Sequence, residues 1–135
     1  MAYTTIDDPS AYFQTDLYTG TGSSLANTFD GNSDMQPDLV WIKKRNSGES
    51  HAVCDSTRGT SATLFSDNDA VESTSSEVVK AYNSDGFTVG TEGIVNDSSD
   101  TYVAWAWKAN GGSTTSATTT DGIDSATRQV DSTSK

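Results

Sequence analysis

Short stretches in which apolar and polar residues alternate run along most of the chain, and this spacing is typical of β-strands. In residues 11–18, Phe13 and Leu17 would share one face of a strand, while Tyr12 and Tyr18 would share the other. Further apolar stretches lie at residues 39–43, 51–54, 86–89 and 101–108. The pattern therefore predicts a β-rich fold.

The last of these stretches, residues 101–108, places its bulky side chains on one face of a strand. Val103, Trp105 and Trp107 would lie there, opposite Tyr102 and two alanines. Aromatics opposite small residues suit a strand that packs between a core and a close neighbour. The core predicted from the sequence comprises Phe13, Leu17, Trp41, Ile42, Val53, Phe87, Val89, Val103 and Trp105.

Stretches rich in Gly, Asn, Asp and Ser separate the predicted strands, as turns do in antiparallel sheets. These stretches lie at residues 19–24, 30–34, 46–48, 83–86 and 96–100. Their regular spacing predicts an all-β fold, an antiparallel β-sandwich of jelly-roll-like or lectin-like type. Only residues 75–82 have the composition of a helix, so we expect at most one short helix.

The composition changes after Lys108. Residues 109–120 consist only of Ala, Asn, Gly, Ser and Thr, and residues 111–135 hold too few aliphatic side chains to fold by themselves. We therefore predict a sandwich domain at residues 1–110 and an extended Thr/Ser-rich tail at 111–135. The tail is either a linker-like terminus or an assembly arm that lies across a neighbouring protein, and we favour the arm.

The 135 residues carry 19 acidic and 8 basic side chains, which gives a formal charge of −11. Nucleic acid is not an expected partner, because a phosphate backbone requires clustered Lys and Arg and only residues 43–45 form such a cluster. No apolar run is long enough to cross a membrane, and no signal peptide opens the chain. The glycosylation sequon at Asn96 therefore means little.

Residues that could carry catalysis are scarce. His51 is the one histidine and Cys54 the one cysteine, and on a regular strand these two side chains would point to opposite faces. We interpret His51 as a strand residue with a satisfied imidazole and Cys54 as a buried, inert thiol. Phosphate-binding and dinucleotide motifs are missing as well. We predict that the protein is not an enzyme.

Asp30, Asn32 and Asp34 have the one-three-five spacing that opens a calcium-binding loop. The sequence then departs from the pattern of a calcium-binding loop. Met35 occupies the position of the turn glycine, and Trp41 occupies the position of the bidentate glutamate. Alternative metal ligands are residues 67–69 or the pair Asp97 and Asp100. The competing interpretation is that all these residues form turns. Calcium is the only cofactor that the sequence suggests.

Arg58 lies between Asp55 and Gly59 in a stretch that follows a predicted strand. A guanidinium group can bind carboxylate and backbone acceptors at the same time. We therefore predict that Arg58 anchors a loop or forms a buried ion pair.

Five segments of the chain resemble a domain that opens virion structural proteins, often tail-fibre-like, of marine bacteriophages and cyanophages. The segments are AYTTIDDPSAYFQT at residues 2–15, QPDLVWIK at 36–43, DSTRG at 55–59, NSDGFTVG at 83–90 and YVAWAWKA at 102–109. They follow one another in the order of that family. The resemblance implies a virion location, after assembly in the host cytoplasm, and it brings no catalytic residues.

We therefore expect an accessory surface protein of a bacteriophage capsid or tail, a decoration or fibre-associated component that acts through protein–protein contacts. Its expected partners are other virion proteins and copies of itself. The alternative is a carbohydrate-binding adhesin domain, in which exposed aromatics such as Trp41, Trp105 or Trp107 stack on host-surface glycans.

Overall fold

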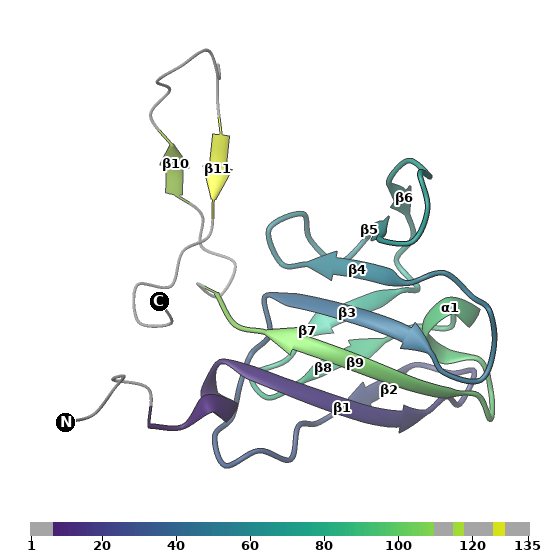
Figure 1. The fold of residues 1–135 in the computed structure, drawn as a ribbon, viewed down its shortest axis with the longest axis horizontal. Helices are drawn as coiled ribbons and strands as arrows, with labels where there is room; N and C mark the ends of the chain where they lie inside the picture. The colour runs from purple at the N-terminus through teal and green to yellow at the C-terminus, as the bar shows by residue number, and fades with distance from the viewer. Residues whose placement is uncertain (1–6, 110–114, 118–125, 129–135) are drawn as a thin grey trace.

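The computed structural model describes residues 7–109, 115–117 and 126–128. Two antiparallel sheets pack against each other, as predicted, and the fold is a β-sandwich (Figure 1). The large sheet has the strand order β1 (Phe13–Thr19), β9 (Thr101–Trp107), β3 (Leu39–Lys44), β4 (Ala52–Asp55), β5 (Ala62–Phe65) and β6 (Ser73–Thr74). The small sheet has the order β2 (Leu25–Asn27), β8 (Phe87–Val89) and β7 (Val79–Tyr82).

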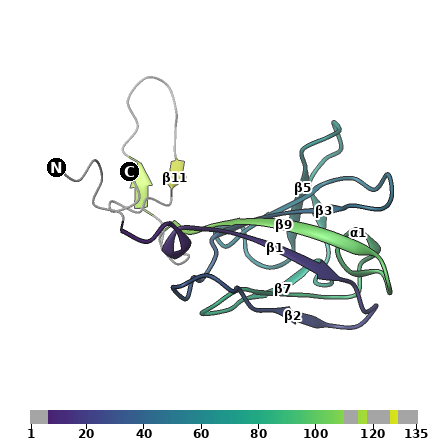
Figure 2. The same cartoon turned by 60° about the horizontal axis from the view of Figure 1, so that its bottom comes forward.

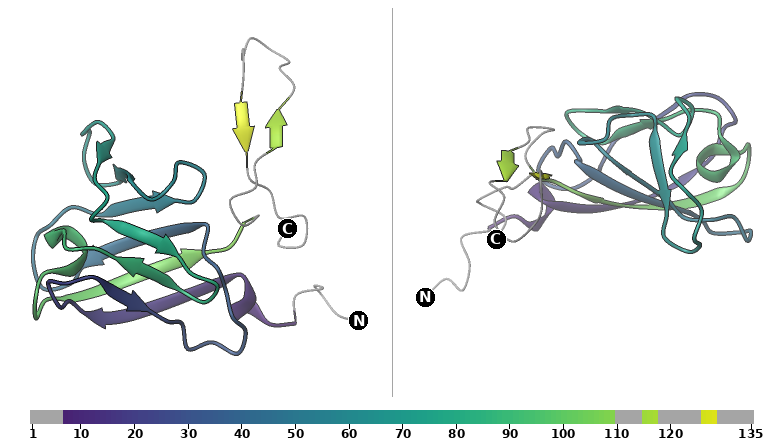
Figure 3. Two further views of the ribbon diagram at one scale, coloured as in Figure 1. Left: turned by 180° about the vertical axis from the view of Figure 1, so that it is seen from behind. Right: turned by 90° about the horizontal axis from the view of Figure 1, so that it is seen from above.

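The two sheets form separate layers, with β2 and β7 on one side and β1, β3 and β9 on the other (Figure 2). Seen from behind, the small sheet lies across the large one (Figure 3). The face of the large sheet that is turned toward the viewer in Figure 1 is therefore the one away from the small sheet. We call it the outer face.

The one α-helix among the described residues is α1 (Gly93–Asn96), which is preceded along the chain by a single 3₁₀ turn at Pro9–Ala11. The helix expected at residues 75–82 is wrong, because β7 occupies Val79–Tyr82 and pairs with β8. Val78 and Val79 are buried in the core. Two adjacent valines favour a strand, and cross-strand packing against β8 decides the outcome.

Small side chains of β9 and β3 face the core and let the two sheets approach. Ala104 and Ala106 of β9 are fully buried, as are Val40 and Ile42 of β3. The small sheet supplies Val79, Val89 and Phe87 to the same core. The predicted core residues Ile42, Phe87 and Val89 are thus confirmed.

The other six predicted core residues lie instead on the outer face of the large sheet. Phe13 and Leu17 are 40% and 62% exposed, whereas Tyr102 on the inner face of β9 is fully buried. Alternation shows which residues share a face of a strand, but it does not show which face meets the second sheet. The misplaced residues are Phe13, Leu17, Trp41, Val53, Val103 and Trp105.

Arg58 anchors the loop between β4 and β5, as predicted. Its Nε donates to Asp55 at 2.6 Å, its Nη1 to Glu72 at 2.8 Å and its Nη2 to the carbonyl of Val53 at 3.2 Å. The side chain is 25% exposed and thus only partly screened by solvent. The three acceptors fit the planar fork of a guanidinium group.

We expect Arg58→Lys to lower the free energy of unfolding by about 1 kcal/mol, because an ammonium group cannot reach all three acceptors at once. Thermal unfolding followed by circular dichroism measures the change. Arg45→Lys, an exchange at an exposed position after β3, is the control. An unchanged melting temperature for Arg58→Lys would show that the anchor contributes nothing.

The predicted tail at residues 111–135 lies mostly outside the described residues. Within it, β10 (Thr115–Ala117) and β11 (Ala126–Arg128) pair as antiparallel strands. Its role as an assembly arm stays a prediction.

A candidate docking face on the large sheet

The outer face of the large sheet carries three rows of side chains that run across the strands. The pairing registers define these rows, since residues opposite each other on neighbouring strands lie side by side on one face. The first row is Phe13, Trp107, Leu39 and Asp55; the middle row is Thr15, Trp105, Trp41, Val53 and Leu64; the third row is Leu17, Val103 and Lys43. Continuing the β3–β4 register by one residue places His51, the residue before β4, opposite Lys43 at the end of the third row.

Nine of these positions are apolar, and several are open to solvent. Trp107 is 37% exposed and Leu64 is 41% exposed, in addition to Phe13 and Leu17. Single exposed apolar residues are ordinary on protein surfaces, whereas a contiguous patch of them marks an interaction site or a ligand-binding groove.

Ring contacts hold the aromatic side chains of this face in place. The ring centroids of Phe13 and Trp107 lie 5.1 Å apart, with the rings tilted by 48°. The centroids of Trp41 and Trp105 lie 5.6 Å apart, with a tilt of 57°. Tilted pairs at these distances are favourable for aromatic quadrupoles. The face is therefore a pre-ordered surface in the free chain.

His51 fixes the orientation of Trp41. The indole Nε1–H of Trp41 donates to Nδ1 of His51 at 2.9 Å, so one of the two imidazole nitrogens has a partner. His51 lies immediately before β4 and not on the strand where it was predicted. Cys54 lies on the opposite side of the sheet, 1% exposed, with Thr63 as its hydrogen-bonding partner. Burial raises the pKa of the Cys54 thiol and leaves it protonated at neutral pH. The two residues thus form no catalytic pair.

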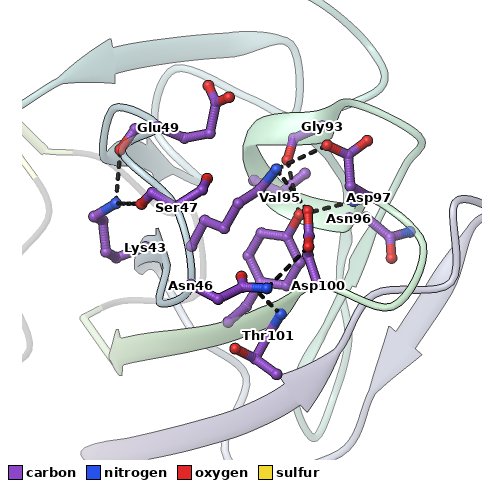
Figure 4. A network of polar contacts seen from close by, with 12 residues as sticks. Lys43, Asn46, Ser47, Glu49, Gly93, Val95, Asn96, Asp97, Asp100 and Thr101 are labelled. Atoms are coloured by element: carbon purple, nitrogen blue, oxygen red, sulfur yellow. Dashed lines mark hydrogen bonds and ion pairs between the residues drawn. The ribbon is translucent and has the colours of Figure 1, made fainter.

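The outer face is almost free of net charge, although the chain carries −11. Its three rows hold two residues that are charged at neutral pH, Lys43 and Asp55, and these have opposite signs. Lys43 donates to the carbonyls of Ser47 and Glu49 (Figure 4), and Asp55 is paired with Arg58. The acidic surplus therefore lies elsewhere on the domain.

Acidic residues meet a buried lysine at one end of the large sheet. The side chain of Lys44 is 3% exposed, and its Nζ lies 2.7 Å from Asp97 and 3.0 Å from Asp100. Burial alone would lower the pKa of Lys44, but the hydrogen bonds to the two carboxylates outweigh it and raise the pKa above its usual value. Asp97 and Asp100, an alternative metal pair in the sequence, hold the protein's own ammonium group.

Asp30, Asn32 and Asp34 are all exposed. Throughout the described residues, no group of three or more His, Cys, Asp and Glu side chains gathers where it could hold a metal ion. The calcium site at Asp30, Asn32 and Asp34, like the alternative at residues 67–69, stays a prediction without support from this geometry.

Asn96 lies at the end of α1 and joins three segments of the chain. Its Oδ1 accepts from the backbone N–H of Thr21 at 2.8 Å, and its Nδ2 donates to the carbonyls of Ser23 and Gly90, both at 2.6 Å. Asn96, which Figure 4 labels next to Asp97, is fully buried. Both amide hydrogens are occupied, so the sequon at Asn96 is inaccessible to glycosylation in the folded domain.

No pocket opens in the part of the chain that the structure describes, and none of the helices described there is long and apolar enough to cross a membrane. The feature that stands out is therefore a flat surface. Sequence reasoning named six of its nine apolar residues but assigned them to the core. The usable signal was the alternation along β9, where the buried Ala104 and Ala106 face the partner sheet and the larger Val103, Trp105 and Trp107 lie on the opposite face.

The described chain is thus a β-sandwich domain with an ordered apolar outer face. It belongs to the DUF7483 family, a domain of unknown function, which matches residues 8–134. The match spans the sandwich and most of the predicted tail. No curated protein and no solved structure matches the chain. The resemblance to phage virion domains stays a prediction.

Proposed function

We propose that this protein is a structural component of a bacteriophage particle, an accessory surface protein of the capsid or tail that acts through protein–protein contacts. The observation that carries the proposal is the apolar outer face of the large sheet. A coat or appendage protein needs a surface that another protein covers, and the aromatic and aliphatic composition of this face is typical of such a surface.

Two further features support the proposal. The full chain has a formal charge of −11, which keeps a free subunit soluble before assembly, while the outer face itself is nearly neutral. Five segments resemble virion domains of marine phages, which supports a phage particle as the assembly. The exposed apolar rings then become buried only when the domain docks.

The test replaces Leu17 and Trp107 on the outer face by glutamate in the full chain. Both side chains are partly exposed, so we expect the free energy of unfolding to change by less than about 1 kcal/mol. A phage that encodes Leu17→Glu/Trp107→Glu should package the protein at no more than about a tenth of the wild-type level, because two charges would be buried without partners.

Mass spectrometry of purified particles measures the copy number. Val71→Glu, at an apolar side chain that is 86% exposed and lies outside the three rows, is the matched control and should be packaged normally. Normal packaging of the double variant, or absence of the wild-type polypeptide from native particles, would refute the proposal.

A second candidate is a carbohydrate-binding adhesin domain, and the exposure of Phe13 and Trp107 at one corner of the face favours it. Exposed aromatic rings can stack on sugars through their apolar faces. The 48° tilt between these two rings ranks it second, because one flat sugar chain cannot stack on both. Binding to a glycan array that disappears with Trp107→Ala would favour this function; no binding to host-surface glycans would remove it.

A further inference from the structure

We propose that the partner of the outer face is a second copy of this chain. The two copies stack face to face about a two-fold axis that crosses the strands along the middle row. This inference rests on the proposed function, because it takes the outer face to be a protein-docking surface. It adds the identity of the partner and the orientation of the contact.

Electrostatics favours this face as the contact between copies. Two chains of charge −11 repel each other over most of their surfaces. The three rows hold one positive side chain, Lys43, and one negative side chain, Asp55. Two copies can therefore approach through the outer face without bringing their acidic surpluses into contact.

The exposed apolar area of the face is about half of what a standard dimer interface needs. The exposed fractions of Phe13, Leu17, Leu64 and Trp107 correspond to apolar area on the order of 400 Å², taking usual side-chain areas. The half-buried members of the rows add to this, and a standard interface buries about 800 Å² on each partner. The four exposed side chains alone fall within the range of the largest patches on ordinary monomers, so the half-buried members of the rows must contribute as much again for a full interface.

The order of side chains in the rows makes the face complementary to itself. A two-fold axis along the middle row brings the first row of one copy against the third row of the other. Phe13 would then face the second copy's Leu17, and Trp107 would face the second copy's Val103. Rings of the first row thus meet smaller side chains of the third row. Trp41 and Trp105 of the middle row meet their own copies on the axis, and Lys43 faces the second copy's Leu39.

The same axis brings unlike polar groups together at the end of the rows. Asp55, a carboxylate, would face the second copy's His51, whose Nε2 is left for an outside partner because Nδ1 accepts from Trp41. The symmetry repeats this contact on the other side of the axis. In this isologous arrangement, neither Lys43 nor Asp55 therefore faces a side chain of like charge.

The open edge of β1 is a less suitable route to self-association. β1 lies at the edge of the large sheet, and its Asp16 pairs with Ala104 and so points toward the inner face. Burial and the nearby charge of Asp30 raise the pKa of Asp16. An inward-pointing acidic residue on an edge strand is a known guard against edge-to-edge pairing. The face, and not the edge, is left for a second copy.

Sedimentation velocity of the full chain across the micromolar range tests the inference. We expect a monomer–dimer equilibrium for the wild type, and association at least about tenfold weaker for Leu17→Lys alone and for Phe13→Glu alone. In a mixture of the two variants, association should be at least about tenfold stronger than for either variant alone. The reason is that one Lys–Glu contact and one native contact then form across the axis. Val71→Glu should dimerise like the wild type.

A wild-type chain that stays monomeric, or a mixture that associates no better than either variant alone, would overturn the inference. Circular dichroism at each step verifies that the variants are folded. A monomeric chain whose packaging into particles still depends on Leu17 and Trp107 would overturn the second copy as partner and leave the proposed function standing. The two proposals therefore fail separately.

Discussion

Asn96→Asp is expected to lower the free energy of unfolding at neutral pH by about 3–5 kcal/mol, a large part of the stability of a small domain. The substitution hardly changes the shape of the side chain. It does replace the amide that donates to the carbonyls of Ser23 and Gly90 by a carboxylate oxygen. A fully buried anion would then face two carbonyl oxygens.

The pH dependence of this variant separates charge from shape. Burial beside two carbonyl oxygens raises the pKa of the new carboxyl in the folded state, so the penalty is present above that folded pKa and is relieved as the pH falls through it. The protonated carboxyl can also donate to one carbonyl. We expect the difference in free energy of unfolding between the variant and the wild type to become smaller at acidic pH. Urea unfolding at several pH values measures this difference.

Asn32→Asp is the matched control, because it makes the same chemical change at an exposed position. Its free energy of unfolding should stay within about 0.5 kcal/mol of the wild type. An Asn96→Asp chain as stable as this control at neutral pH would contradict the assigned role of Asn96 as the joint between α1, the β1–β2 loop and Gly90.

Gly86→Ala should have the second largest effect, a loss of at least about 3 kcal/mol. Gly86 lies in the turn between β7 and β8 with φ at +101°, a conformation that residues with a Cβ rarely adopt. A Cβ there would also collide with the backbone carbonyl oxygen of Asn27 on the neighbouring segment. Both the strain and the clash act on the small sheet, which supplies Val79, Phe87 and Val89 to the core.

Two other glycines separate the causes. Gly59 has φ at +91° with open space around its Cα, so Gly59→Ala tests the backbone strain alone, expected at about 1–2 kcal/mol. Gly48 has open space and needs no left-handed conformation, so Gly48→Ala should be neutral within about 0.5 kcal/mol. Chemical denaturation of the three variants gives the order of their losses in free energy of unfolding. Equal stability of all three would rule out both causes.

The fold class could be predicted from the sequence because it depends on local features. Alternation along residues 11–18 and 101–108 and the Gly- and Asn-rich turns are local, and they predicted the antiparallel sandwich. The strand at Val79–Tyr82 was missed although its signals are local. Two adjacent valines precede the predicted turn at residues 83–86, and the partner strand β8 follows that turn directly.

The outer face shows a second limit of sequence reasoning. Residues such as Trp41, Trp105 and Leu17 are as apolar as a core, and hydrophobicity alone cannot distinguish an intramolecular core from a surface that a partner covers. The distinction comes from packing, since Ala104 and Ala106 leave room for Phe87 and the small sheet on one side only. The aromatic side of β9 remains outside.

The position of polar residues was predictable only in part. The spacing of Asp55 and Arg58 indicated the loop anchor, which the structure bears out. The pairing of Lys44 with Asp97 and Asp100 joins residues more than 50 positions apart, and no local pattern announces it. The same holds for Asn96, whose three partners lie on two loops.

A density map of a native particle that contains this protein tests the central claim most directly, because it shows whether the outer face of the large sheet is covered. We predict that Leu17, Trp105 and Trp107 contact another polypeptide, and that this polypeptide is a second copy of the chain. A map in which the three side chains face solvent in every copy would contradict the account.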